Sequence, residues 1–535
     1  MGTVAPSSSL AAPALCIAIA LLPTIRLLTC ALRKIRGGCR GGQADAHAAT
    51  CSPSFCFIDQ PGSEHVALTP PWLKEAVAGS SLGEGGSSES LPAAPPPELT
   101  PPALQEFKDA VQRAGGQLPL SFGMPARQQL FCLEPDAVYL NHGSYGAAFR
   151  LGVEVAHWYQ LQLEAQPVRF METAGIRGLV AAVAQVARWV GAGPADVVPV
   201  PNATTAVNAV LHSLPLRKGD VILVMNTTYP AVRSAAARTA AKSGARLLLV
   251  NLAAADLSPD PRAVIAIMRR AVAAVAPGRL ALAILDHVIS FPPVILPVKE
   301  LVEVCRQAGA RVLLDGAHAF GSVPDLDVPS LGADYYTSNL HKWGCCPKGA
   351  AFLWAHPRVQ SGLLPLVTSH GYGQGFRAEF LWQGTQSPSA WLAAPACLAV
   401  LHALGPSRVA CHNSALVLEA ANSLRDQLAA GGEQGDGLSS PAIVGGDGQG
   451  GNAGMLAVRL PPLTAYPAAS TSSAGELHDM LRQQHGIEVP VVRWEGSLWV
   501  RLSAQIYNTP HDYQRLVDVL KPLLVCVSVA RGGSN

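Results

Sequence analysis

The chain has 535 residues, enough for two or three domains and a large buried core. Its 39 lysines and arginines nearly balance its 37 aspartates and glutamates, so the charge does not indicate nucleic acid or another polyanion as the main partner. The 12 cysteines lack the paired spacings of a zinc site and lie mostly in apolar runs, which predicts reduced thiols and no metal.

Residues 1–44 differ from the rest and are expected to form a targeting leader. They contain no acidic residue, and an apolar stretch at 10–25 precedes all of their basic residues. A secretory signal carries its positive charge before the apolar stretch, so a transit peptide for an organelle (a mitochondrion or a plastid) fits this order better. A membrane anchor is the alternative, because apolar residues continue past Arg26, although Pro13 and Pro23 disfavour a spanning helix.

The domain boundaries follow from changes in composition. Residues 45–103 are expected to be a low-complexity linker, because the stretch 78–102 is rich in serine, glycine and proline and cannot form a core. An N-terminal segment, 104–150, should lead into a large domain at 151–395. A small domain should follow at 396–525.

The large domain reads as alternating strands and helices. Bulky residues repeat at helical spacing over 178–190, whereas other runs are short and almost continuously apolar. Such runs, separated by helix-length segments, predict an α/β fold with a mostly parallel sheet covered on both faces. The predicted strands are 220–226, 246–252, 280–286, 311–315 and 349–355.

Polar residues at the ends of these strands mark the candidate site, because ligands of such sheets lie at the carboxyl ends of the strands. Two runs end in aspartate, at Asp286 and Asp315. For a single aspartate, a helix cap or a loop acid is the simpler interpretation. A further strand, which ends at Ser338 and Asn339, leads directly to Lys342. We therefore expect Asp315 and Lys342 to meet one ligand at the same edge of the sheet.

A dinucleotide site of the Rossmann type is an alternative without support. No GxGxxG motif follows an early strand, and the glycine pairs near 445–451 lie in a low-complexity stretch. This stretch, 431–452, is expected to be a flexible surface insertion in the small domain.

Pyridoxal phosphate requires the combination of an acid and a lysine. The lysine forms an imine with its aldehyde, and the acid keeps its pyridine nitrogen protonated. Its phosphate needs backbone N–H donors at the start of a helix, together with hydroxyl groups. The stretch 201–214 offers these, because Asn202 is a good N-cap and Thr204 and Thr205 fall in the first turn. Taken alone, the same stretch reads equally well as a plain capped helix.

Several segments, in chain order, resemble the class V aminotransferase family of fold-type I pyridoxal-phosphate enzymes. They are most similar to the branch that contains isopenicillin N epimerase-like proteins and L-cysteine desulfhydrases. The resemblance extends from about residue 138 to about residue 519 and implies a large cofactor-binding domain with a mostly parallel sheet and a smaller C-terminal α+β domain. The segments are "NATTA", "DHVIS", "LLDGAHAFG", "GADYYTSNLHKWG", "WQGTQS" and "VRLSAQIYNTPHDYQRL".

The resemblance assigns roles around the cofactor. It implies that Lys342 binds the aldehyde, that Asp315 holds the pyridine nitrogen, and that His318 lies near the phenolic oxygen. Tyr229 would stack on the ring face, a role that suits a flat side chain, although a turn tyrosine before Pro230 is the alternative. The implied phosphate ligands are Ala203, Thr204, Thr205, Ser338 and His341.

The resemblance also implies contacts beyond the cofactor. Gly384 and Thr385 would reach the phosphate of a neighbouring subunit, which implies a homodimer with the active site at the interface. Arg501 would bind the carboxylate of an amino-acid substrate, because a guanidinium offers it two parallel donors. Asn141 and His142 would approach the substrate, although His142 could instead bond to loop backbone.

Such a site supports more than one reaction. Lys342 would take the α proton of the substrate once burial and nearby cations lower its pKa. Cysteine desulfurases carry a catalytic cysteine shortly before the strand of the arginine, and 483–501 contains none. Cys345 and Cys346 are expected in the core. The nearest resemblance implies a C–S lyase that releases sulfide, pyruvate and ammonia from cysteine or a relative. An epimerase or aminotransferase is the first alternative, and a pseudoenzyme or binding protein is the second.

The small domain is predicted to mix helices and strands. Its expected elements are a helix at 414–430, a strand at 454–460, a helix at 475–486, a strand at 497–503 and a helix from residue 511.

Overall fold

The computed structural model describes residues 70, 73–74, 100–257, 260–429, 442–446, 452–466 and 469–524. The predicted leader, 1–44, lies outside these residues. One described residue of the predicted linker, Leu73, is fully buried in the main core. Part of 45–103 therefore belongs to the folded body, and the first complete helix, α3, already begins at Pro102.

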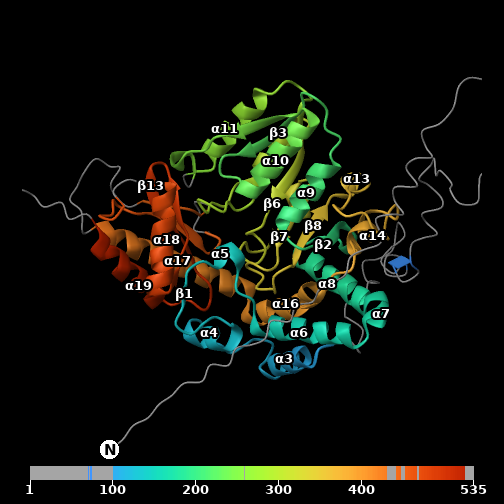
Figure 1. Ribbon diagram of the computed structural model, residues 1–535, viewed down its shortest axis with the longest axis horizontal. Helices are drawn as coiled ribbons and strands as arrows, with labels where there is room; N and C mark the ends of the chain where they lie inside the picture. The colour runs from blue at the N-terminus through green and yellow to red at the C-terminus, as the bar shows by residue number, and fades with distance from the viewer. Residues whose placement is uncertain are drawn as a thin grey trace, which may run out of the picture. The chain divides into compact units, whose positions relative to one another are not determined.

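A seven-stranded sheet with the order β2-β8-β7-β6-β5-β3-β4 forms the centre of the large domain (Figure 1). Neighbouring strands from β7 to β4 are parallel, whereas β8 runs antiparallel to both β7 and β2. The expected mostly parallel α/β sheet is thereby confirmed. The strands are β2 (Val197–Val200), β3 (Val221–Met225), β4 (Arg246–Val250), β5 (Leu280–Asp286), β6 (Arg311–Asp315), β7 (Tyr335–Asn339) and β8 (Ala351–Ala355).

Helices bury both faces of this sheet. In β3, Ile222 and Val224 pack in one cluster with α9 and α10, whereas Leu223 and Met225 belong to the cluster on the opposite face. Burial on both faces explains why the strands read as continuous apolar runs rather than as alternating ones. The covering helices are α8 (Gly175–Trp189), α9 (Ala203–Ser213), α10 (Pro230–Ser243), α11 (Arg262–Ala273) and α12 (Val298–Gln307).

The remaining helices of the large domain pack around its edge. Among the described residues, one unbent helical segment, Pro167–Trp189, is long and apolar enough to cross a membrane, but 67% of its most apolar window is buried inside the protein. It behaves as a core helix. The other helices include α4 (Met124–Leu130), α6 (Arg150–Ala165), α7 (Pro167–Arg169), α13 (Pro357–Gln360), α14 (Phe376–Leu381), α15 (Ser389–Leu392) and α16 (Ala394–Leu404).

A second core forms in the C-terminal part, around a four-stranded antiparallel sheet of order β12-β13-β10-β9. Figure 1 shows its helices, in orange and red, beside the large domain. The elements are α17 (Pro406–Ala429), β9 (Ile443–Val444), β10 (Met455–Arg459), α18 (Thr471–His485), β11 (Ile487–Glu488), β12 (Val491–Trp494), β13 (Ser497–Ser503) and α19 (Pro510–Leu520).

Two expectations about this part differ from the structure. The boundary predicted at residue 396 falls inside α16, whose side chains belong to the main core, whereas α17 contributes to the second core only from Leu416 onward. The predicted insertion at 431–452 also contains a strand, because Ile443 and Val444 pair with β10. The sequence did not predict this strand, because its two apolar residues lie within a glycine-rich stretch.

The N-terminal segment connects to the C-terminal part. Strand β1 (Val138–Tyr139) pairs with β11 in parallel, and the short helix α5 (His142–Tyr145) follows it. Gly146 ends this helix with φ +69°, and a Cβ there would lie 2.3 Å from the His341 carbonyl oxygen. Glycine is required at this position, because the backbone of the N-terminal segment touches the backbone next to Lys342.

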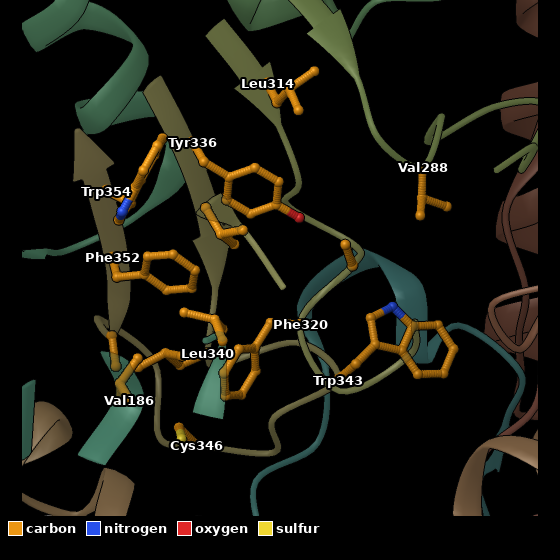
Figure 2. Close-up of a cluster of buried hydrophobic side chains, with 14 of the residues drawn as sticks. Val186, Val288, Leu314, Phe320, Tyr336, Leu340, Trp343, Cys346, Phe352 and Trp354 are labelled. Carbon is orange, nitrogen blue, oxygen red and sulfur yellow. The ribbon is translucent and has the colours of Figure 1, made fainter. Parts of the chain in front are cut away.

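The loop that carries Lys342 is anchored by large side chains. Trp343 is 1% exposed and Phe320 is likewise buried. In Figure 2 the rings of Phe320 and Phe352 lie near Leu340, and their centroids are 6.1 Å apart. Cys345 and Cys346 are fully buried, which confirms their predicted place in the core.

Candidate active site

A cavity of about 170 Å³ opens at the carboxyl ends of β5, β6 and β7, the edge at which a ligand was expected. It brings together seven predicted site residues: Ala203, Thr204, Tyr229, Asp315, His318, His341 and Lys342. The sequence assigned no contact with a ligand to several other lining residues, among them Ser144, Asp286, Ser290 and Asn339, whereas Asn202 lines the cavity as the predicted N-cap.

Two buried carboxylates end neighbouring strands of the cavity floor. Asp286 and Asp315 are register partners on β5 and β6. Burial raises the pKa of both, and the charge of Asp315 raises that of Asp286 further, whereas the Ala317 N–H and Lys342 oppose the rise in the pKa of Asp315. The Thr228 hydroxyl donates to Asp286 (2.9 Å), and the Ala317 N–H donates to Asp315 (3.0 Å). Burial and the charge of Asp315 act in the same direction on Asp286, so its pKa is raised more strongly than that of Asp315 and it is the carboxyl that holds a proton more readily.

Lys342 lines the same cavity as Asp315. Its Nζ is 3.1 Å from Nε2 of His318. Burial, assisted by the charge of Arg501, lowers the pKa of Lys342 from 10.5 to about 7, and Asp315 partly opposes the shift. Near neutral pH, Lys342 is consequently a free amine in a large fraction of molecules.

His318 is a neutral imidazole with one unused ring nitrogen. Burial and the charges of Lys342 and Arg501 hold its pKa well below the ordinary value. Its Nδ1 is buried and has no hydrogen-bond partner among the described residues. A buried polar atom without a partner destabilises the protein, so this nitrogen indicates where a ligand atom would bind.

The start of α9 forms the side of the cavity predicted to hold phosphate. Asn202 is the N-cap, as expected, because its Oδ1 accepts from the Thr205 N–H at 2.8 Å. The Thr205 hydroxyl donates to the same oxygen, and Thr205 does not line the cavity. The Ala203 N–H donates to Oδ1 of Asn339 at 2.9 Å. Thr204 and the helix start thus face the ligand, while the Thr205 side chain completes the cap.

Ser338 and His341 are placed differently from each other. The Ser338 hydroxyl is fully buried, donates to the Gly316 carbonyl and accepts from the Phe320 N–H, so it does not line the cavity. This placement contradicts its expected contact with phosphate. His341 lines the cavity, but its Nδ1 donates to the Ala350 carbonyl (2.8 Å), and burial lowers its pKa to about 4. Its Nε2 would donate to a phosphate only after gaining a proton, which a nearby anion favours.

Arg501 is a buried cation without a buried anion. On β13 it is 5% exposed and forms no ion pair within the described part of the chain. It donates to the carbonyl and hydroxyl of Ser290 (2.9 and 3.1 Å), to Oδ1 of Asn141 (3.0 Å) and to the Ser144 hydroxyl (2.8 Å). Its Nε is buried and has no partner among the described residues, and burial lowers the pKa of Arg501 to about 10. Arg501 itself does not line the cavity, but its partners Ser144 and Ser290 do, so an anion bound beside these serines would relieve an uncompensated charge.

His142 does not reach the cavity, which contradicts its expected contact with substrate. It is fully buried, with its ring centroid 4.8 Å from that of Trp343. Its Nδ1 lies 3.0 Å from the Tyr507 hydroxyl, and its Nε2 lies 3.2 Å from the Lys342 carbonyl. The alternative for His142, a bond to loop backbone, is the one that the structure supports. Asn141 also lies outside this cavity and contacts Arg501 instead.

The last three predicted residues lie in different places: Tyr229 lines the cavity of Lys342, whereas Gly384 and Thr385 do not. Tyr229 precedes α10, lines the cavity and is 46% exposed, so its ring has room to move toward a ligand. Gly384 lines a separate cavity beside Trp382, and Thr385 is exposed. Within one chain, therefore, neither residue meets Lys342.

The cavity matches the chemistry of pyridoxal phosphate. It offers an amine for an aldehyde, the carboxyl group of Asp315 for a pyridine nitrogen, and the start of a helix for a phosphate. Two buried nitrogens, Nδ1 of His318 and Nε of Arg501, have no partner among the described residues. Sequence reasoning missed Asp286 and Asn339 as site residues although both end strands, and it missed Ser144 and Ser290 because these serines meet only in the folded chain.

Comparisons with known proteins agree with the geometry. The sequence model of the family described as aminotransferase class-V matches residues 154–429. The chain is 34% identical to a putative L-cysteine desulfhydrase 1 of Oryza sativa subsp. japonica over 73% of this chain and 84% of the relative. It is 32% identical to an isopenicillin N epimerase of Streptomyces clavuligerus over 73% of this chain and 96% of that protein.

A solved structure supports the fold. The apo cysteine desulfurase of Thermococcus onnurineus NA1 aligns with a TM-score of 0.61 and 18% identity, over 76% of this chain and 99% of that one. The match over more than half of the chain, together with the similarity of the relatives, shows that the chain belongs to the class V aminotransferase family of pyridoxal-phosphate-dependent enzymes.

Proposed function

We propose that the protein is a C–S lyase that eliminates sulfide from L-cysteine or a related amino acid. The observation that carries the proposal is the buried guanidinium of Arg501, which forms no ion pair in the described part of the chain and whose charge lowers the pKa of Lys342. Arg501 donates to Ser144 and Ser290, which line the cavity of Lys342, so a cation and an amine would meet the carboxylate and the α carbon of one amino acid. The similarity to an L-cysteine desulfhydrase supports the choice of substrate.

The residues that would hold the cofactor follow from their chemistry. Lys342 would bind the aldehyde, Asp315 the ring nitrogen, Thr204 and the start of α9 the phosphate, and Tyr229 the ring face. His318 would direct its free Nδ1 or the Nε2 now beside Lys342 toward the phenolic oxygen. When bound, pyridoxal phosphate supplies an aldehyde for the substrate amine and a ring that accepts electrons from the α carbon.

The chain's own groups would then act in order. Arg501 binds the carboxylate and orients the substrate. Once the substrate amine has displaced it, Nζ of Lys342 would take the proton from the α carbon, a role for which burial and Arg501 suit it because they lower its pKa in the free chain. Sulfide would then leave the β carbon, and hydrolysis by one water would release pyruvate and ammonia. The overall reaction converts one cysteine and one water into one sulfide, one pyruvate and one ammonia.

Elimination rather than persulfide formation is favoured by the cavity lining. No cysteine lines the cavity in the described part of the chain. Cys345 is the cysteine nearest to Lys342 in the sequence. It is fully buried beside His142, and burial raises the pKa of its thiol. A buried thiol with a raised pKa is a poor nucleophile.

The proposed active unit is a homodimer in which Gly384 and Thr385 approach the partner's phosphate site. Two features support it. Both residues lie away from Lys342 of their own chain. Large apolar side chains are also exposed on two stretches of the chain, as is common at an interface. They are Val153, Leu161 and Val168 on the first stretch, and Leu364, Leu366, Val367 and Tyr372 on the second.

The proposed location is an organelle, on the strength of residues 1–44, which carry basic residues but no acidic one. A fusion of this segment to a fluorescent protein tests the proposal. Import into a mitochondrion or plastid supports it, and retention in the cytosol or on the secretory pathway refutes it.

Purified protein with added pyridoxal phosphate and L-cysteine tests the reaction. Release of sulfide and pyruvate in equal amounts, abolished by Lys342→Ala, is the expected outcome. If the protein racemises or transaminates amino acids and releases no sulfide, the lyase assignment is wrong and the protein is an epimerase or an aminotransferase. A protein that gains no visible absorbance with the cofactor would be a binding protein instead.

A further inference from the structure

We propose that Glu488, at the end of β11, is a positioning residue that holds the amide of Asn141 and, through it, the guanidinium of Arg501. The inference rests on the proposed role of Arg501 in binding the substrate carboxylate. Glu488 does not line the cavity of Lys342 and would act only through Asn141.

Asn141 joins Glu488 to Arg501. Its Nδ2 donates to Oε1 of Glu488 at 2.9 Å. Its Oδ1 accepts from Arg501 at 3.0 Å and from the Ser144 hydroxyl at 2.5 Å. Asn141 is 8% exposed, so its amide has few other partners to choose from.

The chemistry of the two neighbours permits only one orientation of this amide. An ionised carboxylate only accepts hydrogen bonds, and a guanidinium only donates them. The amide therefore must turn its NH₂ to Glu488 and its oxygen to Arg501, because the reverse orientation would oppose donor to donor and acceptor to acceptor. Glu488 is itself held by Nε2 of His478 at 3.1 Å, and both side chains are about three-quarters buried.

A fixed amide matters because Arg501 forms no ion pair in the described part of the chain that would orient it. There its terminal nitrogens bond to neutral groups, on Asn141, Ser144 and Ser290. Ser144 and Ser290 line the cavity of Lys342, whereas Asn141 lines a neighbouring cavity together with Glu488. Asn141 thus anchors the guanidinium from that neighbouring cavity, and losing its orientation would leave the guanidinium to be ordered when the carboxylate arrives.

A neighbouring cavity supplies a matched control. Glu488 lines it together with His478, Arg482 and Tyr145. Arg482 donates to Asp479 on the surface at 2.9 Å, and no bond to Asn141 accompanies that contact. Arg482→Ala therefore changes the charge and shape of this cavity without touching the bonds of Asn141.

The test compares two small reagents that both consume the aldehyde of the bound cofactor. Aminooxyacetate carries a carboxylate and O-methylhydroxylamine does not. The rate at which each removes the visible absorbance of the holoenzyme is measured for wild type, Glu488→Ala, Glu488→Gln, Arg482→Ala and Arg501→Lys. A thermal melt of each variant verifies that it is folded.

Glu488→Ala should slow capture by aminooxyacetate about tenfold and leave capture by O-methylhydroxylamine unchanged. Glu488→Gln should restore most of the rate, because its amide oxygen still accepts from Asn141, and Arg482→Ala should match the wild type. Combining Glu488→Ala with Arg501→Lys should add little to the effect of Arg501→Lys alone.

Two results would overturn the role of Glu488 and leave that of Arg501 intact. One is that Glu488→Ala slows both reagents equally, and the other is that the effects of Glu488→Ala and Arg501→Lys on the capture rate add fully in the double variant. If Arg501→Lys itself does not distinguish the reagents, the proposed carboxylate site fails and the role of Glu488 fails with it. The readout does not depend on whether the enzyme is a lyase, an epimerase or an aminotransferase.

Discussion

Lys342 should react as a free amine at neutral pH even before the cofactor binds. Burial and Arg501 together lower its pKa from 10.5 to about 7. At pH 7 an ordinary lysine exposes a free amine in about one molecule in 3,000, whereas a pKa of about 7 leaves about half of the molecules reactive. The reactive fraction at neutral pH is thus on the order of a thousandfold larger than for an unburied lysine.

Replacing Arg501 by methionine tests the cause of this shift. The positive charge of Arg501 disfavours protonation of Lys342, so its removal should raise the pKa of Lys342 and move the reactive range to higher pH. Arg482→Met, in the neighbouring cavity, removes an arginine that is not among the causes of the shift and should leave the pKa of Lys342 where it is.

Competitive labelling of the apoenzyme with acetic anhydride measures both effects. The yield of acetylated peptide containing Lys342 is followed against pH, with N-acetyl-lysine amide in the same solution as the reference. The half-point should lie near pH 7 in the wild type and higher in Arg501→Met. A wild-type half-point at the value of the reference amide would refute the idea that burial keeps Lys342 uncharged.

Three further predictions concern the rest of the site. Asp286→Asn should weaken the affinity for pyridoxal phosphate less than Asp315→Asn does, because burial and the charge of Asp315 together raise the pKa of Asp286 more strongly, so that its replacement removes less negative charge. A titration of visible absorbance measures both affinities, and equal losses would contradict this difference between the two carboxyls. Asn202→Ala should destabilise the apoenzyme by about 1 kcal/mol in urea unfolding through loss of the cap on α9, while Asn208→Ala, on the exposed face of the same helix, should change it less. Mixing Lys342→Ala subunits with Thr385→Ala subunits should restore about a quarter of the wild-type activity if each site uses Lys342 of one subunit and Thr385 of the other, and mixtures that stay inactive would place both residues at one chain's site.

The sequence predicts the frame of the site because strand geometry is a local property. Apolar runs that end in Asp315 and lead to Lys342 place both at one edge once the strands are parallel, and the structure has them at that edge. The cap at Asn202 is equally local, since it depends on one side chain and the helix that follows.

The side chains around that frame were harder to assign. Ser338 and Asn339 are adjacent in a strand, so their side chains point in opposite directions, and Asn339 rather than Ser338 reaches the cavity. His142 resembled a substrate contact in sequence, yet its ring is enclosed by Trp343 and Tyr507, which approach it from positions far along the chain.

The sequence by itself determined the alternation of strands and helices, the edge at which acid and amine meet, and the family. Only the tertiary structure decided which acid has its pKa raised more strongly, how far the pKa of Lys342 falls, and that the described hydrogen-bond partners of Arg501 are neutral groups. The physical reason is that helix and strand patterns depend on residues a few positions apart, whereas desolvation and charge coupling depend on groups that come together from β5, β6, β13 and the N-terminal segment.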